Sequence, residues 1–465
     1  MDERTLRSRS LWLDQLAGPL EARPALAGDI VVDVAIVGGG YTGLWTAYSL
    51  LVADPSLRVL VVEREMVGFG ASGRNGGWCV GELAGGLEGA VAAGGREAGI
   101  RMTQAIIDTV DEVGRVVEAE GIECGFAKGG VIRLARNLPQ VQRQRAEVDE
   151  YHEHGFGDDV LRVLDAEAAT GHLRATDVVG GVLYGPAARI QPAQLARGLA
   201  EAAERRGATI VEGTAARAIV PRTAGRPAQV LTDHGTIRAD VVVRATEAYT
   251  RDLDGLRRDI VPLYSLMVAT EPLSSQMWDE IGLRRMETFA DDRRMVIYGQ
   301  RTTDGRLAFG GRGAPYRFGS GIDAATEASS RIHDRIIAAL RQLLPVLGDV
   351  GFSHRWGGVL GVPRDWRPSV GLDRSTGVAW AGGYVGEGVA ATNLAGRTLA
   401  DLVTGADTDL VSLPWVGHRS GRWEPEPLRW AGINAGLRLA GWIDDRESRH
   451  QQTPRAASVL DRIVR

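Results

Sequence analysis

Residues 30–63 constrain the fold of this 465-residue chain more than any other segment. The β-branched run 30–37 predicts a buried strand, and three consecutive glycines, Gly38 to Gly40, end it. Residues 41–53 have helical character, and 58–63 form a second apolar strand. A strand, a glycine turn, a helix and a second strand within about 30 residues are typical of a βαβ unit. We therefore expect an α/β protein.

Three glycines in this unit have the spacing Gly38-x-Gly40-x-x-Gly43 of a dinucleotide-binding turn. The first glycine allows the tight turn, the second lets the backbone approach a pyrophosphate, and the third lets helix and strand pack closely. The helix N-terminus then offers N–H groups to that pyrophosphate. Glu63 ends the second strand, where a carboxylate accepts from ribose hydroxyls and repels a 2′-phosphate. The pattern predicts a site for FAD or NAD and argues against NADP.

Composition and charge exclude several classes of protein. The net charge is −5 with both signs spread along the chain, so a nucleic-acid partner has no electrostatic support. Cys79 and Cys124 are the only cysteines, which excludes a disulfide framework and the spacings of zinc or iron–sulfur sites. We expect no metal. The charged start and the lack of an apolar run near about 18 residues predict a cytoplasmic protein without a membrane span.

Two further glycine-rich segments distinguish FAD from NAD. They are 70–78, GASGRNGGW, and 382–389, GGYVGEGV, which opens a predicted helix. Together with 261–273, VPLYSLMVATEPL, they make the sequence resemble the D-amino acid oxidase superfamily of flavoenzymes. Within it, the sequence is most similar to the gamma-glutamylputrescine oxidase-like amine oxidases, over nearly the whole chain.

The resemblance implies a two-domain flavoprotein of the glutathione reductase / D-amino acid oxidase type. A Rossmann-like FAD domain (1–80, 175–258 and 345–415) is expected to be interleaved with an antiparallel-sheet substrate domain (81–174 and 259–344). Residues 416–465 are expected to form a helical tail, through which a homo-oligomer could form.

The resemblance also implies how FAD is held. Loop 72–77 should wrap the pyrophosphate and the flavin edge, with Arg74 and Asn75 donating. The helix after Gly388 should direct its N-terminus at the flavin pyrimidine, where it stabilises negative charge. No histidine lies in the 70s loop, so we expect non-covalent FAD. The candidate cofactor-binding residues are Gly38, Gly40, Tyr41, Thr42, Gly43, Glu63, Arg64, Ala71, Ser72, Arg74, Asn75, Gly76, Gly77, Gly383, Tyr384, Gly386, Gly388 and Val389.

One departure from the family pattern falls in this site. Flavoproteins of this type often read A-T-G after a later strand of the cofactor domain, and Glu247 stands where that glycine would be. We therefore expect no close approach of backbone to phosphate at this residue.

Other departures bear on the substrate. The related sarcosine and glycine oxidases hold a carboxylate with cations, and the aligned positions here are Ala390 and Trp78-Cys79. Because a carboxylate buried without a cation is costly, we expect an amine rather than a simple α-amino acid. Aromatic rings can hold an ammonium group, and Arg312 is expected to meet an anionic far end of the substrate. The pocket candidates are Trp78, Tyr264, Tyr298, Arg312, Trp356 and Tyr384.

The reaction that follows is oxidation of a C–N bond, with a hydride passing from a neutral amine to flavin N5. The imine hydrolyses to an aldehyde, and O₂ is reduced to H₂O₂; no catalytic base is evident. Ala308 replaces the lysine that helps oxygen react in sarcosine oxidases, so a dehydrogenase with another acceptor is an alternative. An NAD(P)H-linked monooxygenase or reductase is another, although the chain lacks a second GxGxxG. A third is an FAD-bound subunit without turnover of its own.

Overall fold

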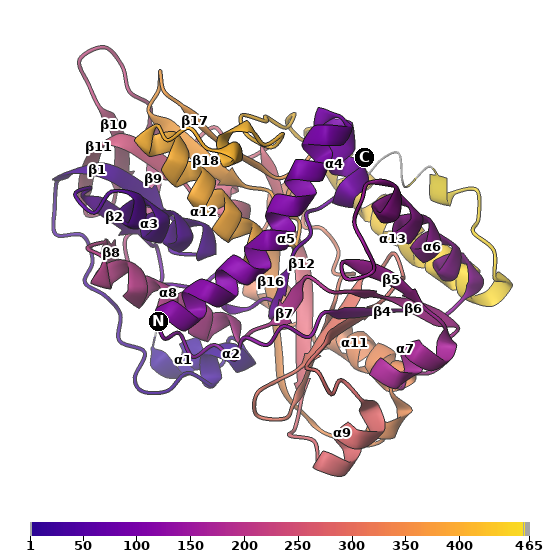
Figure 1. The fold of residues 1–465 in the computed structure, drawn as a ribbon. Coiled ribbons are helices and arrows are strands. Elements are labelled where there is room, and N and C mark those ends of the chain that lie inside the picture. The colour runs from indigo at the N-terminus through magenta and orange to yellow at the C-terminus, as the bar shows by residue number, and fades with distance from the viewer. Residues whose placement is uncertain (1, 459, 461–465) are drawn as a thin grey trace.

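The computed structural model describes residues 2–458 and 460, and two eight-stranded sheets organise it (Figure 1). The first sheet has the order β17-β18-β11-β1-β2-β8, and β10 and β9 extend it from β11. Its strands are β1 (Ile30–Val37), β2 (Val59–Val62), β8 (Thr209–Val211), β9 (Ala216–Val220), β10 (Ala228–Thr232), β11 (Gly235–Arg244), β17 (Ser369–Asp373) and β18 (Val378–Gly382).

The predicted βαβ unit forms the centre of this sheet. Strand β1 pairs in parallel with β2 and β11, and α3 (Tyr41–Ala53) connects β1 to β2. Helix α3 is buried on nearly all sides because α12 (Gly388–Thr404) and α8 (Pro192–Arg205) pack against it. The strand and helix predicted at 30–37 and 41–53 are confirmed.

The second sheet has the order β16-β12-β15-β14-β13-β4-β6-β5 and is antiparallel except where β4 pairs with β13. The α/β class and the interleaved antiparallel sheet are therefore confirmed. Its strands are β4 (Val131–Ala135), β5 (Leu161–Leu164), β6 (Gly180–Tyr184), β12 (Ile260–Thr270), β13 (Thr288–Asp291), β14 (Ile297–Arg301), β15 (Leu307–Gly311) and β16 (Phe352–Pro363). A separate ribbon pairs β3 (Trp78–Val80) with β7 (Ala187–Arg189).

Several boundaries differ from the prediction. Residues 86–119 form two helices that meet at Gly95, whose φ of 81° ends one helix and begins the other. Strands β6 and β16 lie in the second sheet, although 175–258 and 345–415 were assigned to the FAD unit. Sheet membership depends on the distant strand that pairs with each segment, which a local apolar pattern does not reveal. The remaining helices are α1 (Glu3–Arg7), α2 (Leu11–Asp14), α4 (Gly86–Gly94), α5 (Arg96–Ala119), α6 (Leu138–Glu153), α7 (Ala166–His172), α9 (Ser275–Ile281), α10 (Ala324–Glu327), α11 (Ser330–Leu343) and α13 (Leu428–His450).

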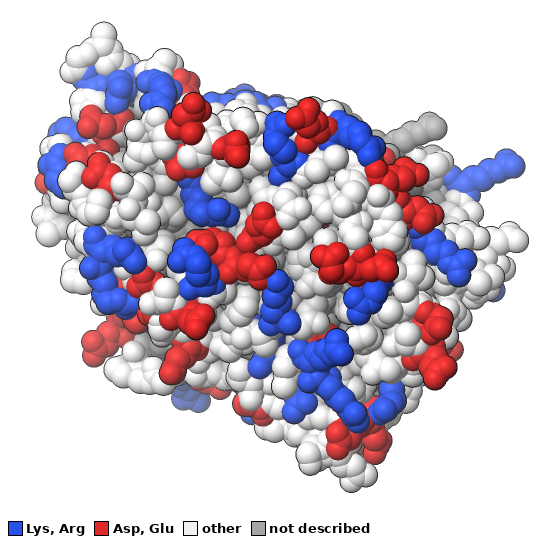
Figure 2. All heavy atoms as spheres, in the orientation of Figure 1, with Lys and Arg blue, Asp and Glu red and all other residues white. Residues whose placement is uncertain are grey.

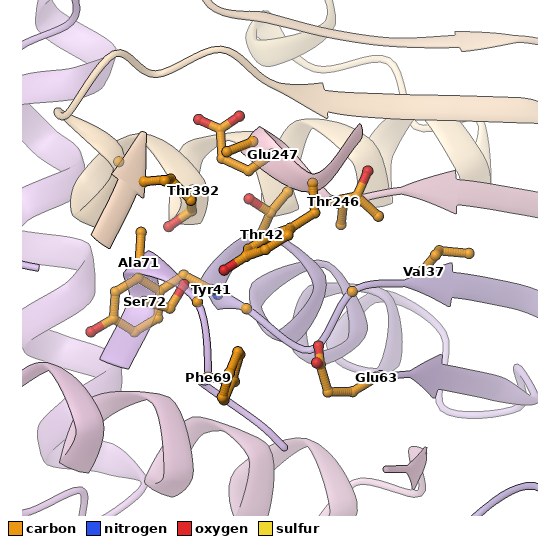
Figure 3. Close-up of a pocket in the computed structure, with 18 of the residues that line it drawn as sticks. Val37, Tyr41, Thr42, Glu63, Phe69, Ala71, Ser72, Thr246, Glu247 and Thr392 are labelled. Atoms are coloured by element: carbon orange, nitrogen blue, oxygen red, sulfur yellow. Dashed lines mark hydrogen bonds between the residues drawn. The ribbon is translucent and has the colours of Figure 1, made fainter. Parts of the chain in front are cut away.

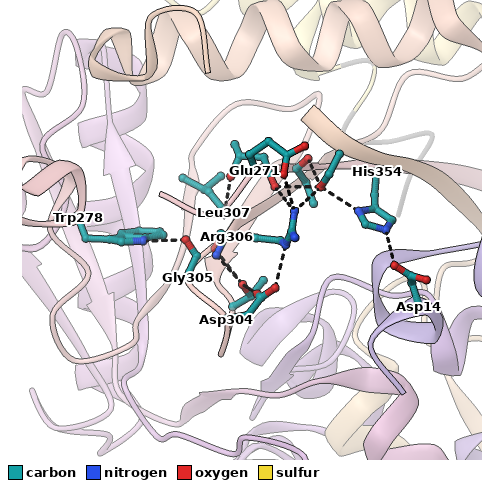
Figure 4. A network of polar contacts seen from close by, with 12 residues as sticks. Asp14, Glu271, Trp278, Asp304, Gly305, Arg306, Leu307 and His354 are labelled. Atoms are coloured by element: carbon teal, nitrogen blue, oxygen red, sulfur yellow. Dashed lines mark hydrogen bonds and ion pairs between the residues drawn. The ribbon is translucent and has the colours of Figure 1, made fainter. Parts of the chain in front are cut away.

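Hydrogen bonds and ion pairs connect helices α2 and α13, near the two ends of the chain, to the rest of the protein. Arg306 donates to the Thr270 carbonyl at 3.1 Å and to Ser353 Oγ at 2.6 Å, and His354 contacts Asp14 in the N-terminal arm (Figure 4). In the tail, Glu447 is fully buried and forms an ion pair of 2.9 Å with Arg143 of α6. Helix α13 is thus a fixed part of the structure.

The surface shows no dominant charge on the face in Figure 2, where basic and acidic side chains are interspersed. Within the described residues, no helix is long and apolar enough to cross a membrane. The same residues contain no group of three or more His, Cys, Asp or Glu side chains arranged to hold a metal ion.

Candidate cofactor and substrate site

Two helix N-termini, whose own N-cap residues offer no side-chain hydrogen bond, face one cavity, which we call the cofactor cavity (Figure 3). Helix α3 begins after Gly40, and helix α12 begins at Gly388. The N–H groups of a helix's first turn lack partners inside the helix and carry partial positive charge, so both ends favour an anionic ligand.

The glycine turn between β1 and α3 leaves no room for side chains. Gly38 has a φ of 115°, and a Cβ there would lie 2.5 Å from the Ala245 carbonyl oxygen. A Cβ on Gly43 would lie 2.0 Å from the Gly38 carbonyl oxygen. Gly38 and Gly40 line the cavity, whereas Gly43 lies behind them and allows α3 to pack on β1. These are the steric conditions that backbone contact with a pyrophosphate requires.

Glu63 lines the cavity at the end of β2. One carboxylate oxygen accepts from the Gly39 amide at 2.7 Å, and the other accepts from the Glu65 amide at 2.9 Å. Burial raises the pKa of Glu63, while these two amides act in the opposite direction. The carboxylate is held at the edge of the glycine turn, where a ribose hydroxyl would meet it.

The 70s loop supports the cavity in two ways. Ala71, Ser72 and Asn75 line it, and Ser72 Oγ accepts from the Tyr41 amide at 2.9 Å. Arg74 instead points away from the cavity, because its buried guanidinium pairs with Glu327 at 2.7 Å. Gly76 and Gly77 also lie outside the lining, where they pack closely against Tyr298 and Gln300 of β14.

The loop after β18 closes the opposite side of the cavity. Tyr384, Gly386, Gly388 and Val389 line it, and the Tyr384 hydroxyl lies 3.3 Å from Thr42 Oγ1. Gly383 does not line the cavity; its amide donates to the carboxylate of Glu247.

The sequence did not identify several lining residues. Several of them follow the carboxyl end of β11, which is parallel to β1, so the rule that ligands bind at the ends of parallel strands was the available signal. The lining residues missed include Phe69, Gly70, Thr246, Glu247, Tyr249, Asp252 and Thr392.

A second cavity, of about 870 Å³, lies between α4, α13, the 363–367 loop and the start of β12. It adjoins the cofactor cavity at Leu263, which pairs with Leu360 in the cofactor-cavity wall. Arg312 lines it and donates to the Val385 carbonyl at 2.6 Å. The lining residues are Ala84, Gly85, Glu88, Gly89, Ala92, Ala93, Leu263, Arg294, Met295, Arg312, Arg364, Asp365, Trp366, Arg367, Trp423, Glu424, Leu428, Arg429, Gly432, Ile433, Gly436, Leu437, Ala440 and Leu460.

Of the six substrate-pocket candidates, Arg312 lines the second cavity and Tyr384 lines the cofactor cavity. The other four pack beside these cavities without lining either. Trp78 and Tyr298 are in edge contact, Trp356 donates to the Arg74 carbonyl at 2.9 Å, and the Tyr264 hydroxyl accepts from the Asp323 amide at 2.7 Å. The aromatic side chains that do line the second cavity are Trp366 and Trp423.

The positions aligned with the cations of the amino acid oxidases face away from both cavities. Ala390 and Cys79 are fully buried in the core that packs α3 against α12. Ala390, Trp78 and Cys79 therefore line neither of the two cavities.

The charges around the second cavity are only partly balanced. Arg364 pairs with Glu424 at 2.9 Å, and Arg429 pairs with Glu426 at 3.0 Å. Among the described residues, no carboxylate forms an ion pair with Arg312 or Arg367. Burial lowers the pKa of Arg312, and Glu387 acts on it in the opposite direction without an ion pair.

Both cysteines are buried and lie outside the lining of the two cavities. Burial raises the pKa of the Cys79 thiol, and it raises the pKa of Cys124 to about 11. Neither thiol is therefore available as a nucleophile toward a flavin.

Comparison with known proteins identifies several oxidoreductases to which this chain is similar. The chain is 29% identical to the gamma-glutamylputrescine oxidoreductase of Escherichia coli over 84% of this chain and 89% of that protein. It is 30% identical to a probable oxidoreductase OrdL of Rhizobium meliloti over 86% of this chain and 89% of that protein. The structure of glycine oxidase from Geobacillus kaustophilus superposes with a TM-score of 0.68 at 21% identity, covering 83% of this chain and 99% of that chain.

Residues 33–402 match the family model described as FAD dependent oxidoreductase, DAO. This match spans both sheets and every segment of the cofactor cavity. The uncapped helix ends, the glycine turn and Glu63 fit the phosphates and ribose of FAD. The chain therefore belongs to the DAO family of FAD-dependent oxidoreductases.

Proposed function

We propose that this protein oxidises the C–N bond of an amine to an imine, which hydrolyses to an aldehyde, with O₂ as the final electron acceptor. The observation that carries the proposal is that the two cavities adjoin, because Leu263 in the wall of the second cavity pairs with Leu360 in the wall of the cofactor cavity. FAD, when bound non-covalently, supplies the two-electron acceptor. A relative named gamma-glutamylputrescine oxidoreductase supports an amine substrate.

The residues of the cofactor cavity bind and orient FAD. The α3 N-terminus and Gly40 would hold the pyrophosphate, while Glu63 would accept from the ribose. The α12 N-terminus, at Gly388, offers partial positive charge where a reduced flavin would carry negative charge. Such a helix end contributes about 0.3–1 kcal/mol when exposed and up to ~2 kcal/mol when partly buried.

The second cavity would bind the substrate and exclude water from it. Trp366 and Trp423 offer apolar faces that can also hold a cation. Arg312 and Arg367 would bind an anionic group on the substrate, since no ion pair within the described chain neutralises them. Helix α13 forms the outer wall and limits the length of the substrate body.

The amine would lose its proton to solvent before oxidation. Among the described residues that line the two cavities, none is a histidine or a lysine, the side chains most suited to accept a proton from an amine near neutral pH. Turnover should therefore rise with pH as the bound amine deprotonates, and a flat profile from about pH 6 to about pH 10 would contradict this step.

The test is an anaerobic titration of the purified holoprotein with amines, including gamma-glutamylputrescine, and with α-amino acids. Bleaching of the flavin band near ~450 nm by an amine, followed by peroxide formation in air, is the expected result. Bleaching by NADH alone would assign the protein to the reductases. Reduction of a dye without peroxide would identify a dehydrogenase. Release of the flavin by acid precipitation checks that it is not covalently bound.

A further inference from the structure

Glu247 is a non-glycine residue in a backbone conformation that favours glycine. Its φ is 43°, and it is the first residue of the short 3₁₀ helix η2 (Glu247–Asp252) that follows β11. A left-handed backbone at a residue with a long side chain is uncommon and persists where the surroundings hold it. The family pattern often has glycine at this place, so the strained backbone coincides with a departure from that pattern.

Glu247 lines the cofactor cavity, and its carboxylate points toward the backbone of the loop after β18 (Figure 3). Its two carboxylate oxygens accept from the amides of Gly383 at 3.0 Å and Tyr384 at 3.2 Å. The neighbouring chain makes room for it, because a Cβ on Gly361 would lie 2.5 Å from Glu247 Oε2. A Cβ on Gly382 would lie 3.1 Å from the same atom. The glycines in β16 and β18 therefore leave the space that this carboxylate occupies.

The charges around Glu247 do not neutralise it. Within the described residues it forms no ion pair, although Arg244 of β11 lowers its pKa from a distance. Burial outweighs Arg244 and the two amides, and it raises the pKa of Glu247 to about 7. The other titratable or charged groups that line the same cavity are Glu63, Arg64, Tyr249, Asp252 and Tyr384.

We propose that FAD binds to this protein together with one proton, which Glu247 takes from the solvent. The phosphates of FAD bring negative charge into the cavity that the carboxylate shares, and an ionised Glu247 would repel them. Protonation of the carboxylate removes that repulsion and gives Glu247 an O–H group that can donate a hydrogen bond. Glu247 is therefore a positioning residue that makes cofactor affinity depend on pH.

The test measures the dissociation constant of FAD for the apoprotein between pH 6 and 8.5, by the change in flavin fluorescence on binding. The constant should be nearly independent of pH below about 7 and should rise above it, approaching tenfold per pH unit. In Glu247→Gln the slope should disappear. Calorimetry in two buffers of different ionisation enthalpy should show uptake of up to one proton by the wild type and none by the variant.

Matched variants keep the test decisive. Asp252→Asn removes another carboxylate of the same cavity, one that is ion-paired with Arg64, and should retain the wild-type slope. Glu247→Gly restores the residue that the backbone favours, should fold, and should also lose the slope. A wild-type affinity that does not change with pH, or a Glu247→Gln protein with the wild-type slope, would overturn the proposal. Because the readout is FAD binding, it does not depend on which substrate the protein oxidises.

Discussion

The guanidinium of Arg312 donates a hydrogen bond of 2.6 Å to the carbonyl of Val385. Arg312 directly follows strand β15 of the second sheet, and Val385 belongs to the loop before α12, which packs with the first sheet. The contact therefore holds the end of the second sheet against the loop that precedes α12. An arginine with one carbonyl partner retains donors for a ligand.

Arg367 and Arg364 should respond differently to loss of their charge. Arg367 has no carboxylate partner within the described residues, whereas Arg364 pairs with Glu424. Arg367→Gln should raise KM about 10- to 100-fold for an amine that carries a carboxylate, since a hydrogen bond to a charged group contributes about 1.5–3 kcal/mol. The methyl ester of the same amine should show no change. Arg364→Gln, the control, should affect acid and ester alike; an equal effect of Arg367→Gln on both would argue against anion binding.

Helix α13 should set the size of the substrate. Gly432 lines the second cavity, and a Cβ there meets no atom within 4 Å. Gly432→Phe should leave the free energy of unfolding unchanged or increase it, because glycine inside a helix is unfavourable by about 1 kcal/mol. It should raise KM for bulky amines more than for small ones. Ala435→Phe, on an exposed face of α13, is the control. Equal KM values for both variants would contradict the idea that α13 limits substrate size.

Arg74 should affect stability more than cofactor binding. Its side chain is fully buried against Glu327, and removing one partner of a buried ion pair costs about 3–5 kcal/mol. Arg74→Met should therefore lower the denaturant midpoint of the apoprotein strongly. Arg101→Met breaks an exposed pair with Glu97 and should cost about 0–1 kcal/mol. A stable Arg74→Met apoprotein that fails to bind FAD would show instead that Arg74 contacts the cofactor.

Gly43 should be required for the cofactor turn. A Cβ 2.0 Å from the Gly38 carbonyl oxygen must push α3 away from β1, at a cost of about 1–3 kcal/mol or more. Gly43→Ala should unfold more easily and lose FAD, as followed by the visible spectrum after gel filtration. Gly421→Ala, where a Cβ meets nothing within 4 Å, should keep its FAD. Retention of FAD by Gly43→Ala would refute the close packing.

The apoprotein should become less stable as the pH rises from about 4.5 to about 7. The pKa of Glu247 is about 7 in the folded chain against an ordinary value of 4.5, so the folded state holds a proton that the unfolded state has released. This contribution to stability is complete below pH 4.5 and is lost as the pH approaches 7. Denaturant titrations of wild type and Glu247→Gln at several pH values measure the difference, which should level off above pH 7.

The sequence by itself determined the βαβ unit and part of the cofactor cavity. Gly38, Gly40 and Glu63 were identifiable because a turn between a strand and a helix depends on local backbone sterics, and their spacing follows from that geometry. The glycines and Tyr384 of the 383–388 loop were instead identified through the resemblance to the flavoenzyme family. The orientation of the Arg74 side chain was not predicted from the sequence. It depends on an ion pair with Glu327, which lies 253 residues away in the chain.

Only the tertiary structure decided the second cavity and the environment of Glu247. The cavity walls come from α4, the 363–367 loop and α13, none of which carries a motif, and the space between them exists only because these segments pack around it. The sequence marked Glu247 as a departure, but its burial and its two amide donors depend on strands β16 and β18. Desolvation and long-range packing, which set the charge of a buried group, are properties of the folded chain.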